Sequence, residues 1–163
     1  MPAAVAYMNT GLSNIAANSG RRKRTLVVDD SATILHAICA LLDHNKVVEI
    51  VGRAENGSET LDRVRDLQPE LVLLDADMPG MSGLRTALLL SQLHPQIEIV
   101  LMSMDTSVPF RAACSGCGAA AIIYKPKFLK ELRNLLQKPL KKTAAAGWST
   151  RLKPATAHGG QTL

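Results

Sequence analysis

The sequence predicts an α/β protein built on a doubly wound, five-stranded parallel sheet with helices on both faces. Between residues 25 and 138, short apolar runs alternate five times with segments of helical periodicity. Parallel neighbours in a sheet need a right-handed crossover connection, and the intervening helices supply one each time. In addition, polar residues follow several of the apolar runs directly. In open sheets of this class, ligands bind at the carboxyl ends of the strands, so these residues are the first candidates for a site.

The five expected strands are short and rich in aliphatic residues, as parallel strands covered on both faces are. In chain order they span residues 25–29, 47–51, 71–74, 97–102 and 119–124. The third run contains only Leu and Val before it reaches Asp75. We expect it to be the middle strand of a sheet with the flavodoxin-like order 2-1-3-4-5.

The first three helices have recognisable starts and stops. Ser31 can cap the first helix. The second follows Asn56 and ends at Gln68, which precedes a proline, and the third begins after Gly83 and closes before Pro95. Apolar residues recur at helical spacing in the first of them, at Ile34, Leu35, Ile38, Leu41 and Leu42.

Two further helices complete the alternation. A short one is expected over 109–115, stopped by the glycines that follow. Pro126 is expected to start the last helix, because proline is favoured in the first turn. The residues expected to face inward from this helix are Leu129, Leu132, Leu135 and Leu136.

Charge divides the 163 residues into three parts. Residues 1–24 and residues 139–163 each carry four basic residues and no acidic one, whereas residues 25–138 carry 11 basic and 14 acidic residues, a net charge of −3. The net charge of +5 therefore comes from the two flanks. We expect residues 1–24 to be a disordered basic extension, 25–138 the folded domain, and 139–163 a basic low-complexity tail.

The same tail is too short for a helix-turn-helix unit, and Trp148 is its one aromatic residue. No apolar run approaches the ~18 residues of a membrane span, and the first 20 residues lack the pattern of a secretory signal. We therefore expect a cytoplasmic protein with no membrane partner.

Three cysteines, Cys39, Cys114 and Cys117, are too few for a disulfide framework in a chain of this size. The CxxC spacing of Cys114 and Cys117 is compatible with a redox pair or half of a zinc site. No second Cys or His pair lies at suitable spacing to complete a zinc site, so reduced thiols are the simpler expectation.

Polar side chains end four of the five expected strands. Asp29 ends the first and Asp30 follows it, Asp75 follows the third, Ser103 the fourth and Lys125 the fifth. With the order 2-1-3-4-5, all of these meet in one crevice.

A crevice with three carboxylates is suited to a divalent cation, because like charges repel unless a cation balances them. Oxygen ligands favour Mg²⁺ or Mn²⁺. Such a cation could also orient a phosphoryl group, while Lys125 offers it a positive charge and Ser103 a hydroxyl donor. Asp75 is the best-placed nucleophile because its strand is central. No Gly-rich loop with Lys-Ser or Lys-Thr for binding ATP is present, so the phosphoryl group is expected to come from another molecule.

Residues 25 to about 138 resemble the receiver domain of a two-component response regulator. The matching features are the Asp29-Asp30 pair, the stretch LVLLDADMPGMSG at 71–83, Ser103 after IEIVLM, and the Lys125-Pro126 pair. Each is common alone, but together, in this order and spacing, they are specific to that family.

The resemblance implies a mechanism and a set of partners. Asp75 would accept a phosphoryl group from a phosphohistidine on a sensor kinase or phosphotransfer protein. Mg²⁺ (or Mn²⁺) would be held by the side chains of Asp30 and Asp75, by Asp29 through water, and by the backbone carbonyl of Asp77. Ser103 and Lys125 would sense the phosphoryl group and change the surface of the fourth and fifth helices, where a downstream protein binds, and phosphorylation could also lead to a homodimer.

Two residues depart from the family pattern. The position three before Lys125 usually holds an aromatic switch residue, but here it is Ile122, so switching by rotation of an aromatic ring is not expected. Met104 follows Ser103 where a small residue is common. A thioether there should partly screen an acyl phosphate from water and slow its hydrolysis.

The prediction is a stand-alone receiver, acting as a phosphorylation-controlled binding switch or as a phosphorelay intermediate. It would catalyse only its own phosphorylation and dephosphorylation, and no nucleic-acid partner is expected. An alternative is the receiver of a DNA-associated transcriptional regulator without an output domain of its own, acting through its basic flanks. A degenerate receiver, which keeps the fold without turning over phosphate, is a third reading. His36 and His94 are expected to be surface residues without a catalytic role.

Overall fold

The computed structural model describes residues 21–136, and the predictions made for residues 1–20 and 137–163, among them the role of Trp148, lie outside the described residues. Within this range the strands are β1 (Lys23–Val28), β2 (Val48–Ala54), β3 (Leu71–Asp75), β4 (Glu98–Ser103) and β5 (Ala121–Tyr124). The α-helices are α1 (Ala32–Leu42), α2 (Gly57–Leu67), α3 (Gly83–Leu93), α4 (Val108–Cys114) and α5 (Phe128–Leu136). A 3₁₀ turn, Lys125–Lys127, precedes α5.

The strands form one parallel sheet in the order β2-β1-β3-β4-β5, so the predicted fold class and strand order are confirmed. The register aligns the carboxyl ends of β1, β3, β4 and β5. Val28 pairs with Leu74 at the ends of β1 and β3, and Asp75 pairs with Met102 near the end of β4. The residues that follow these strands therefore lie at one edge of the sheet.

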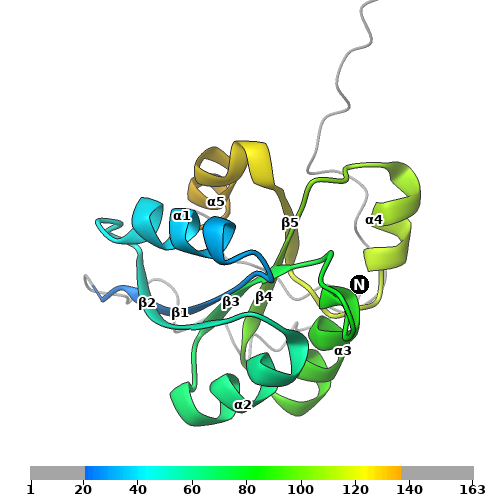
Figure 1. The fold of residues 1–163 in the computed structure, drawn as a ribbon, viewed down its shortest axis with the longest axis horizontal. Helices are drawn as coiled ribbons and strands as arrows, with labels where there is room; N and C mark the ends of the chain where they lie inside the picture. The colour runs from blue at the N-terminus through cyan, green and yellow to red at the C-terminus, as the bar shows by residue number, and fades with distance from the viewer. Residues whose placement is uncertain (1–20, 137–163) are drawn as a thin grey trace, which may run out of the picture.

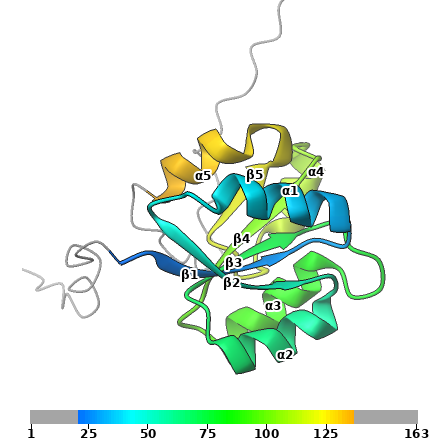
Figure 2. The same cartoon turned by 60° about the vertical axis from the view of Figure 1, so that its left-hand side comes forward.

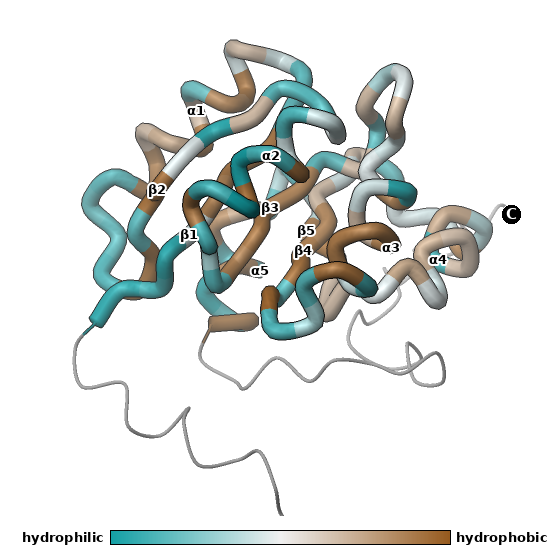
Figure 3. Tube along the Cα trace, turned by 90° about the horizontal axis from the view of Figure 1, so that it is seen from below, coloured by the Kyte–Doolittle hydropathy of each residue, from teal (hydrophilic) through white to brown (hydrophobic). Residues whose placement is uncertain are grey.

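Helices cover both faces of the sheet, with α1 and α5 on one side and α2 and α3 on the other (Figures 1 and 2). Alternate residues of one strand enter different cores, since side chains along a strand point to opposite faces. On β1, Val27 packs with the α1 and α5 residues, whereas Leu26 and Val28 pack with the α2 and α3 residues. The hydropathy colouring shows the hydrophobic stretches of β3, β4 and β5 inside the layers of helices (Figure 3).

Side-chain caps fix where the helices begin. The side chain of Ser31 accepts a hydrogen bond from the Ile34 N–H, as the sequence predicts. Asn56, Ser82 and Ser107 cap α2, α3 and α4 in the same way. All four caps lie in the connections that follow the carboxyl ends of β1, β2, β3 and β4.

The structure corrects the expected start of β1 and one expected buried residue of α5. β1 begins at Lys23 rather than residue 25, because the Lys23 N–H donates to the Val47 carbonyl and extends the pairing with β2. In α5, Leu129 is 42% exposed while Phe128 and Leu132 are buried. Leu132, Leu135 and Leu136 pack on the core as expected, and Phe128, four residues before Leu132, takes the inward position in the first turn.

No helix within residues 21–136 is long and apolar enough to cross a membrane.

Candidate functional site: a carboxylate pocket at the carboxyl edge of the sheet

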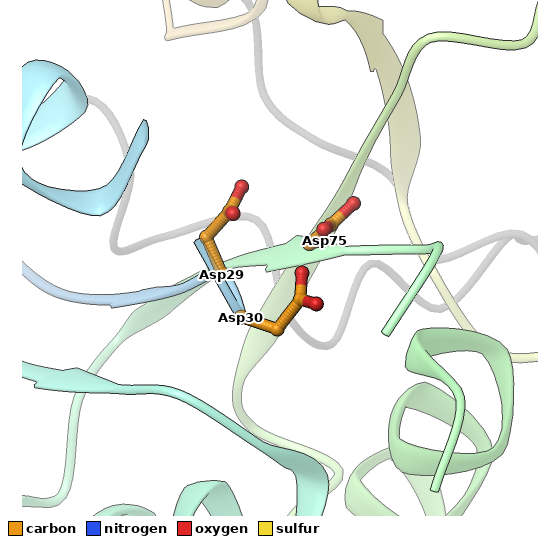
Figure 4. Close-up of side chains that lie close together, drawn as sticks. All are labelled: Asp29, Asp30 and Asp75. Atoms are coloured by element: carbon orange, nitrogen blue, oxygen red, sulfur yellow. The ribbon is translucent and has the colours of Figure 1, made fainter. Parts of the chain in front are cut away.

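The core of the site is a set of carboxylates from two neighbouring strands. Asp29 directly follows β1 and is 0% exposed, and Asp75 ends β3 and is 2% exposed. Asp30, the next residue after Asp29, is exposed. One oxygen from each of the three lies within 4.8 Å of the others, and Figure 4 shows the three side chains gathered at the strand ends. The structure thus brings together the acidic residues that the sequence selected.

One ammonium group faces this cluster. Lys125 Nζ lies 2.8 Å from Asp29 Oδ2 and 3.0 Å from Asp75 Oδ1. Burial alone would lower the pKa of Lys125, but hydrogen bonds and charge from the two aspartates outweigh it, and the pKa is raised. Lys125 is therefore a permanent cation in the pocket.

The pocket contains more negative than positive charge. Burial raises the pKa of Asp75 above its ordinary value, and the charge of Asp29 adds to this. The Lys125 ammonium and the Asp77 N–H, which donates to Asp75 Oδ1 at 3.2 Å, offset the increase only in part. A single lysine does not balance three carboxylates, so the site favours an additional cation.

The loop after Asp75 is held against the pocket by a close backbone contact. A Cβ on Gly83 would collide with the carbonyl oxygen of Asp75. Its N–H donates to the carbonyl of Ala76 at 3.2 Å. Only glycine allows this approach, which explains why the stretch that begins at Leu71 ends in Ser-Gly. The contact positions Asp77 at the mouth of the pocket.

Ser103 ends β4 at the same edge of the sheet and is fully buried. Its hydroxyl donates to Asp77 Oδ2 at 3.0 Å and accepts from the Asp105 N–H at 2.9 Å. The sequence predicted a role only for the backbone carbonyl of Asp77, and its side-chain bond to Ser103 was missed. No periodicity signals such a bond, because it depends on the path of two loops.

The donor set fits a small, hard cation. Its ligand atoms are carboxylate oxygens, with a backbone carbonyl at Asp77 nearby in the chain, and the group contains no His or Cys. Asp29, Asp30 and Asp75 could hold Mg²⁺ or Mn²⁺, with water completing the coordination, since these ions keep several waters.

The remaining candidates do not join the cluster. His36 is exposed and lines a pocket formed by α1, the end of β2 and α2, and His94 caps the end of α3. Cys39, Cys114 and Cys117 are buried and free. Burial, with smaller contributions from Cys117 and nearby acids, raises the pKa of Cys114 to about 12. These thiols remain protonated at neutral pH, which is not the state of a reactive cysteine.

The two residues that depart from the family pattern, Ile122 and Met104, differ in exposure. Ile122 on β5 is partly buried against the core on the α2 and α3 side of the sheet. Met104, directly after Ser103, is 61% exposed.

A parallel α/β fold with an acidic pocket and a lysine at its carboxyl edge defines a receiver-type domain. The family model for the response regulator receiver domain matches residues 25–137. The chain therefore belongs to the response regulator receiver family of two-component systems.

Curated relatives support this assignment. The chain is 35% identical to "Response regulator GacA" of Pseudomonas viridiflava over 109 residues. This aligned region covers 67% of this chain and 51% of that protein. It is 34% identical over 137 residues to "Protein-glutamate methylesterase/protein-glutamine glutaminase 1" of Syntrophomonas wolfei, covering 82% of this chain and 39% of that protein. The chain thus spans about half the length, or less, of these relatives, and the second of them is named as an enzyme.

Solved structures confirm the fold. The receiver domain of RcsB from Salmonella enterica serovar Typhimurium, with the phosphomimetic BeF3−, superposes with a TM-score of 0.66 at 21% identity, over 74% of this chain and 92% of that one. The response regulator domain of Thermotoga maritima CheB gives a TM-score of 0.63 at 22% identity, over 72% and 98% of the two chains.

Proposed function

We propose that Asp75 accepts a phosphoryl group from a phosphohistidine on a sensor kinase or phosphotransfer protein. The observation that carries this proposal is the convergence of Asp29, Asp30 and Asp75 within 4.8 Å, with Lys125 in contact with two of them. A structural ion pair needs one charge of each sign, and this pocket has a surplus of carboxylates at the place where ligands bind in such sheets.

Asp75 is suited to be the nucleophile. Lys125 and the Asp77 N–H both contact its Oδ1, which orients the carboxylate. Oδ2 accepts no hydrogen bond from the residues that the structure describes, so we assign the attack on phosphorus to Oδ2. The new bond joins Oδ2 to phosphorus, the bond between phosphorus and the imidazole nitrogen of the donor breaks, and the imidazole takes up a proton from solvent.

A bound Mg²⁺ would supply positive charge to the phosphoryl oxygens and orient them for in-line attack. In this chain Asp30 and Asp75 would hold it directly, Asp29 through water, and Asp77 through its backbone carbonyl. Lys125 adds the second positive charge, and its ammonium already lies 3.0 Å from Asp75.

The output would be a change in a protein-binding surface. Ser103 and Lys125 would contact the phosphoryl group; Ser103 ends β4 and Lys125 directly follows β5. The elements that come next, α4 and α5, carry exposed apolar side chains, Val108 at 70% and Leu129 at 42% exposure. A downstream protein or a second copy of the chain could bind there in the cytoplasm, where histidine phosphodonors act.

The test is incubation with Mg²⁺ and acetyl phosphate, followed by intact mass and peptide mapping. We expect one added phosphoryl group, on Asp75, that is lost in Asp75→Asn and absent when EDTA replaces Mg²⁺. Asp62→Asn, which alters an exposed acid on α2, is the matched control and should label normally. Labelling of Asp75→Asn at another residue of the pocket, or no labelling of the wild-type protein, would refute the proposal.

A further inference from the structure

The hydroxyl of Ser103 is fully engaged in this structure. It donates its proton to Asp77 Oδ2 at 3.0 Å, and its oxygen accepts the Asp105 N–H at 2.9 Å. A serine hydroxyl has one proton to donate, so it can serve one acceptor at a time. A hydrogen bond to an ionised carboxylate is roughly twice as strong as one between neutral groups.

The same hydroxyl is connected to the start of α4 through consecutive hydrogen bonds. The Asp105 carboxylate accepts the backbone N–H of Ser107 at 2.7 Å and its hydroxyl at 3.1 Å. Ser107 in turn caps α4 by accepting the Phe110 N–H at 3.3 Å. A displacement of Ser103 would therefore pull on the N-terminal turn of α4.

These contacts point to competition between two acceptors. We propose that the Asp77 carboxylate is a positioning residue that holds Ser103, and with it the 103–107 loop, in the resting arrangement. The Ser103 hydroxyl must break its hydrogen bond to Asp77 before it can donate one to a phosphoryl group on Asp75. The strength of the Ser103–Asp77 hydrogen bond thus determines how much of the free energy of phosphoryl binding is needed to move the start of α4. The inference rests on the function proposed above and adds the regulation of the same site.

The Asp77 carboxylate could act through its charge alone, because any anion at the mouth of the pocket repels a phosphoryl group. A series of substitutions separates the two effects. Asp77→Asn removes the charge but keeps an oxygen acceptor, and Asp77→Ala removes both. The Asp77 side chain is exposed, and its N–H contact with Asp75 does not depend on the side chain, so both variants should fold.

The first measurement is the affinity for BeF3− in saturating Mg²⁺, by calorimetry. If the Ser103–Asp77 hydrogen bond must break when BeF3− binds, the affinity for BeF3− should rise about threefold in Asp77→Asn and about tenfold or more in Asp77→Ala. In a Ser103→Ala background the two variants should have the same effect, because no hydroxyl remains to be held. Glu55→Gln, at an exposed acid after β2, is the control for general charge and should leave the affinity unchanged.

The second measurement needs no phosphoryl analogue. Amide hydrogen exchange at Asp105 and Ser107 should accelerate several-fold in Asp77→Ala, less in Asp77→Asn, and not in Glu55→Gln.

Equal effects of Asp77→Asn and Asp77→Ala, or unchanged exchange at both amides, would overturn the Asp77 inference alone. Failure of the wild-type protein to bind BeF3− would refute the proposed function, and this inference with it.

Discussion

The two edges of the sheet both carry charged side chains, but they balance them differently. At the amino edge the charges are paired: Lys23 Nζ lies 2.8 Å from Glu98, and Arg21 lies 2.6 Å from Glu70. At the carboxyl edge three carboxylates lie together, and the ammonium of Lys125 pairs with two of them, Asp29 and Asp75. The edge where carboxylates outnumber their paired ammonium group is the one that we propose to bind an ionic ligand.

The pKa of one acid at each edge reflects this difference in charge balance. For Glu70, burial raises the pKa, but the Arg24 N–H and the Arg21 side chain outweigh it, and the pKa is lowered. For Asp75, burial dominates and the pKa is raised although Lys125 is in contact. The partners of Glu70 stabilise its ionised form, whereas the ionised form of Asp75 costs folding free energy.

The largest expected effect is the removal of Lys125. In EDTA, Lys125→Met should lower the free energy of unfolding by about 2–4 kcal/mol, because it leaves buried carboxylates without their counter-charge. Lys23→Met, at the partly exposed pair of the amino edge, should cost at most about 1 kcal/mol. Urea denaturation of both variants checks this, and equal losses would remove the distinction between the edges.

Magnesium should act at the carboxyl edge alone. With Mg²⁺ at ten times its dissociation constant, the wild-type protein should gain about 1.4 kcal/mol of unfolding free energy, because the ion binds only the folded pocket. Asp30→Asn should reduce the gain and Glu98→Gln should preserve it. The measurement is thermal or urea unfolding with and without the ion, and an undiminished gain in Asp30→Asn would place the ion elsewhere.

The pH dependence of stability should have opposite signs at the two edges. The raised pKa of Asp75 means that the folded state binds the proton more tightly than the unfolded state. Its contribution to stability is therefore lost as pH rises through that pKa. The lowered pKa of Glu70 means that its contribution is present at neutral pH and is lost on acidification.

Two variants test these signs in metal-free urea unfolding. Asp75→Asn should gain stability relative to the wild-type protein as pH rises from 4 to 7, whereas Glu70→Gln should lose it. The same sign for both variants would contradict the comparison.

The smallest expected effect concerns access to the carboxyl edge. If Met104 screens an acyl phosphate on Asp75, Met104→Ala should shorten the phosphoryl lifetime about twofold, or ~0.4 kcal/mol in the hydrolysis barrier. Leu93→Ala is the matched control, since Leu93 is 64% exposed but ends α3 away from the pocket. Phosphate release after removal of the donor gives the lifetime, and an unchanged or longer lifetime in Met104→Ala would count against screening.

The sequence by itself determined the strand order and the convergence of Asp29, Asp30, Asp75 and Lys125. The alternating strand and helix patterns predict a parallel sheet, the resemblance to receiver domains implies its strand order, and the carboxyl ends of parallel strands meet at one edge. The same information predicted the Ser31 cap, which depends on residues three apart.

Only the tertiary structure decided the features that depend on loop paths and helix phase. In the first turn of α5, Phe128 is buried in place of Leu129, and the position of the loop after Asp75 brought the Asp77 side chain to Ser103. Hydrophobic periodicity records which face of an element is buried, but it carries no information about where two irregular segments meet. At this pocket, the contact between the two loops determines that Asp77 accepts the hydrogen bond from Ser103.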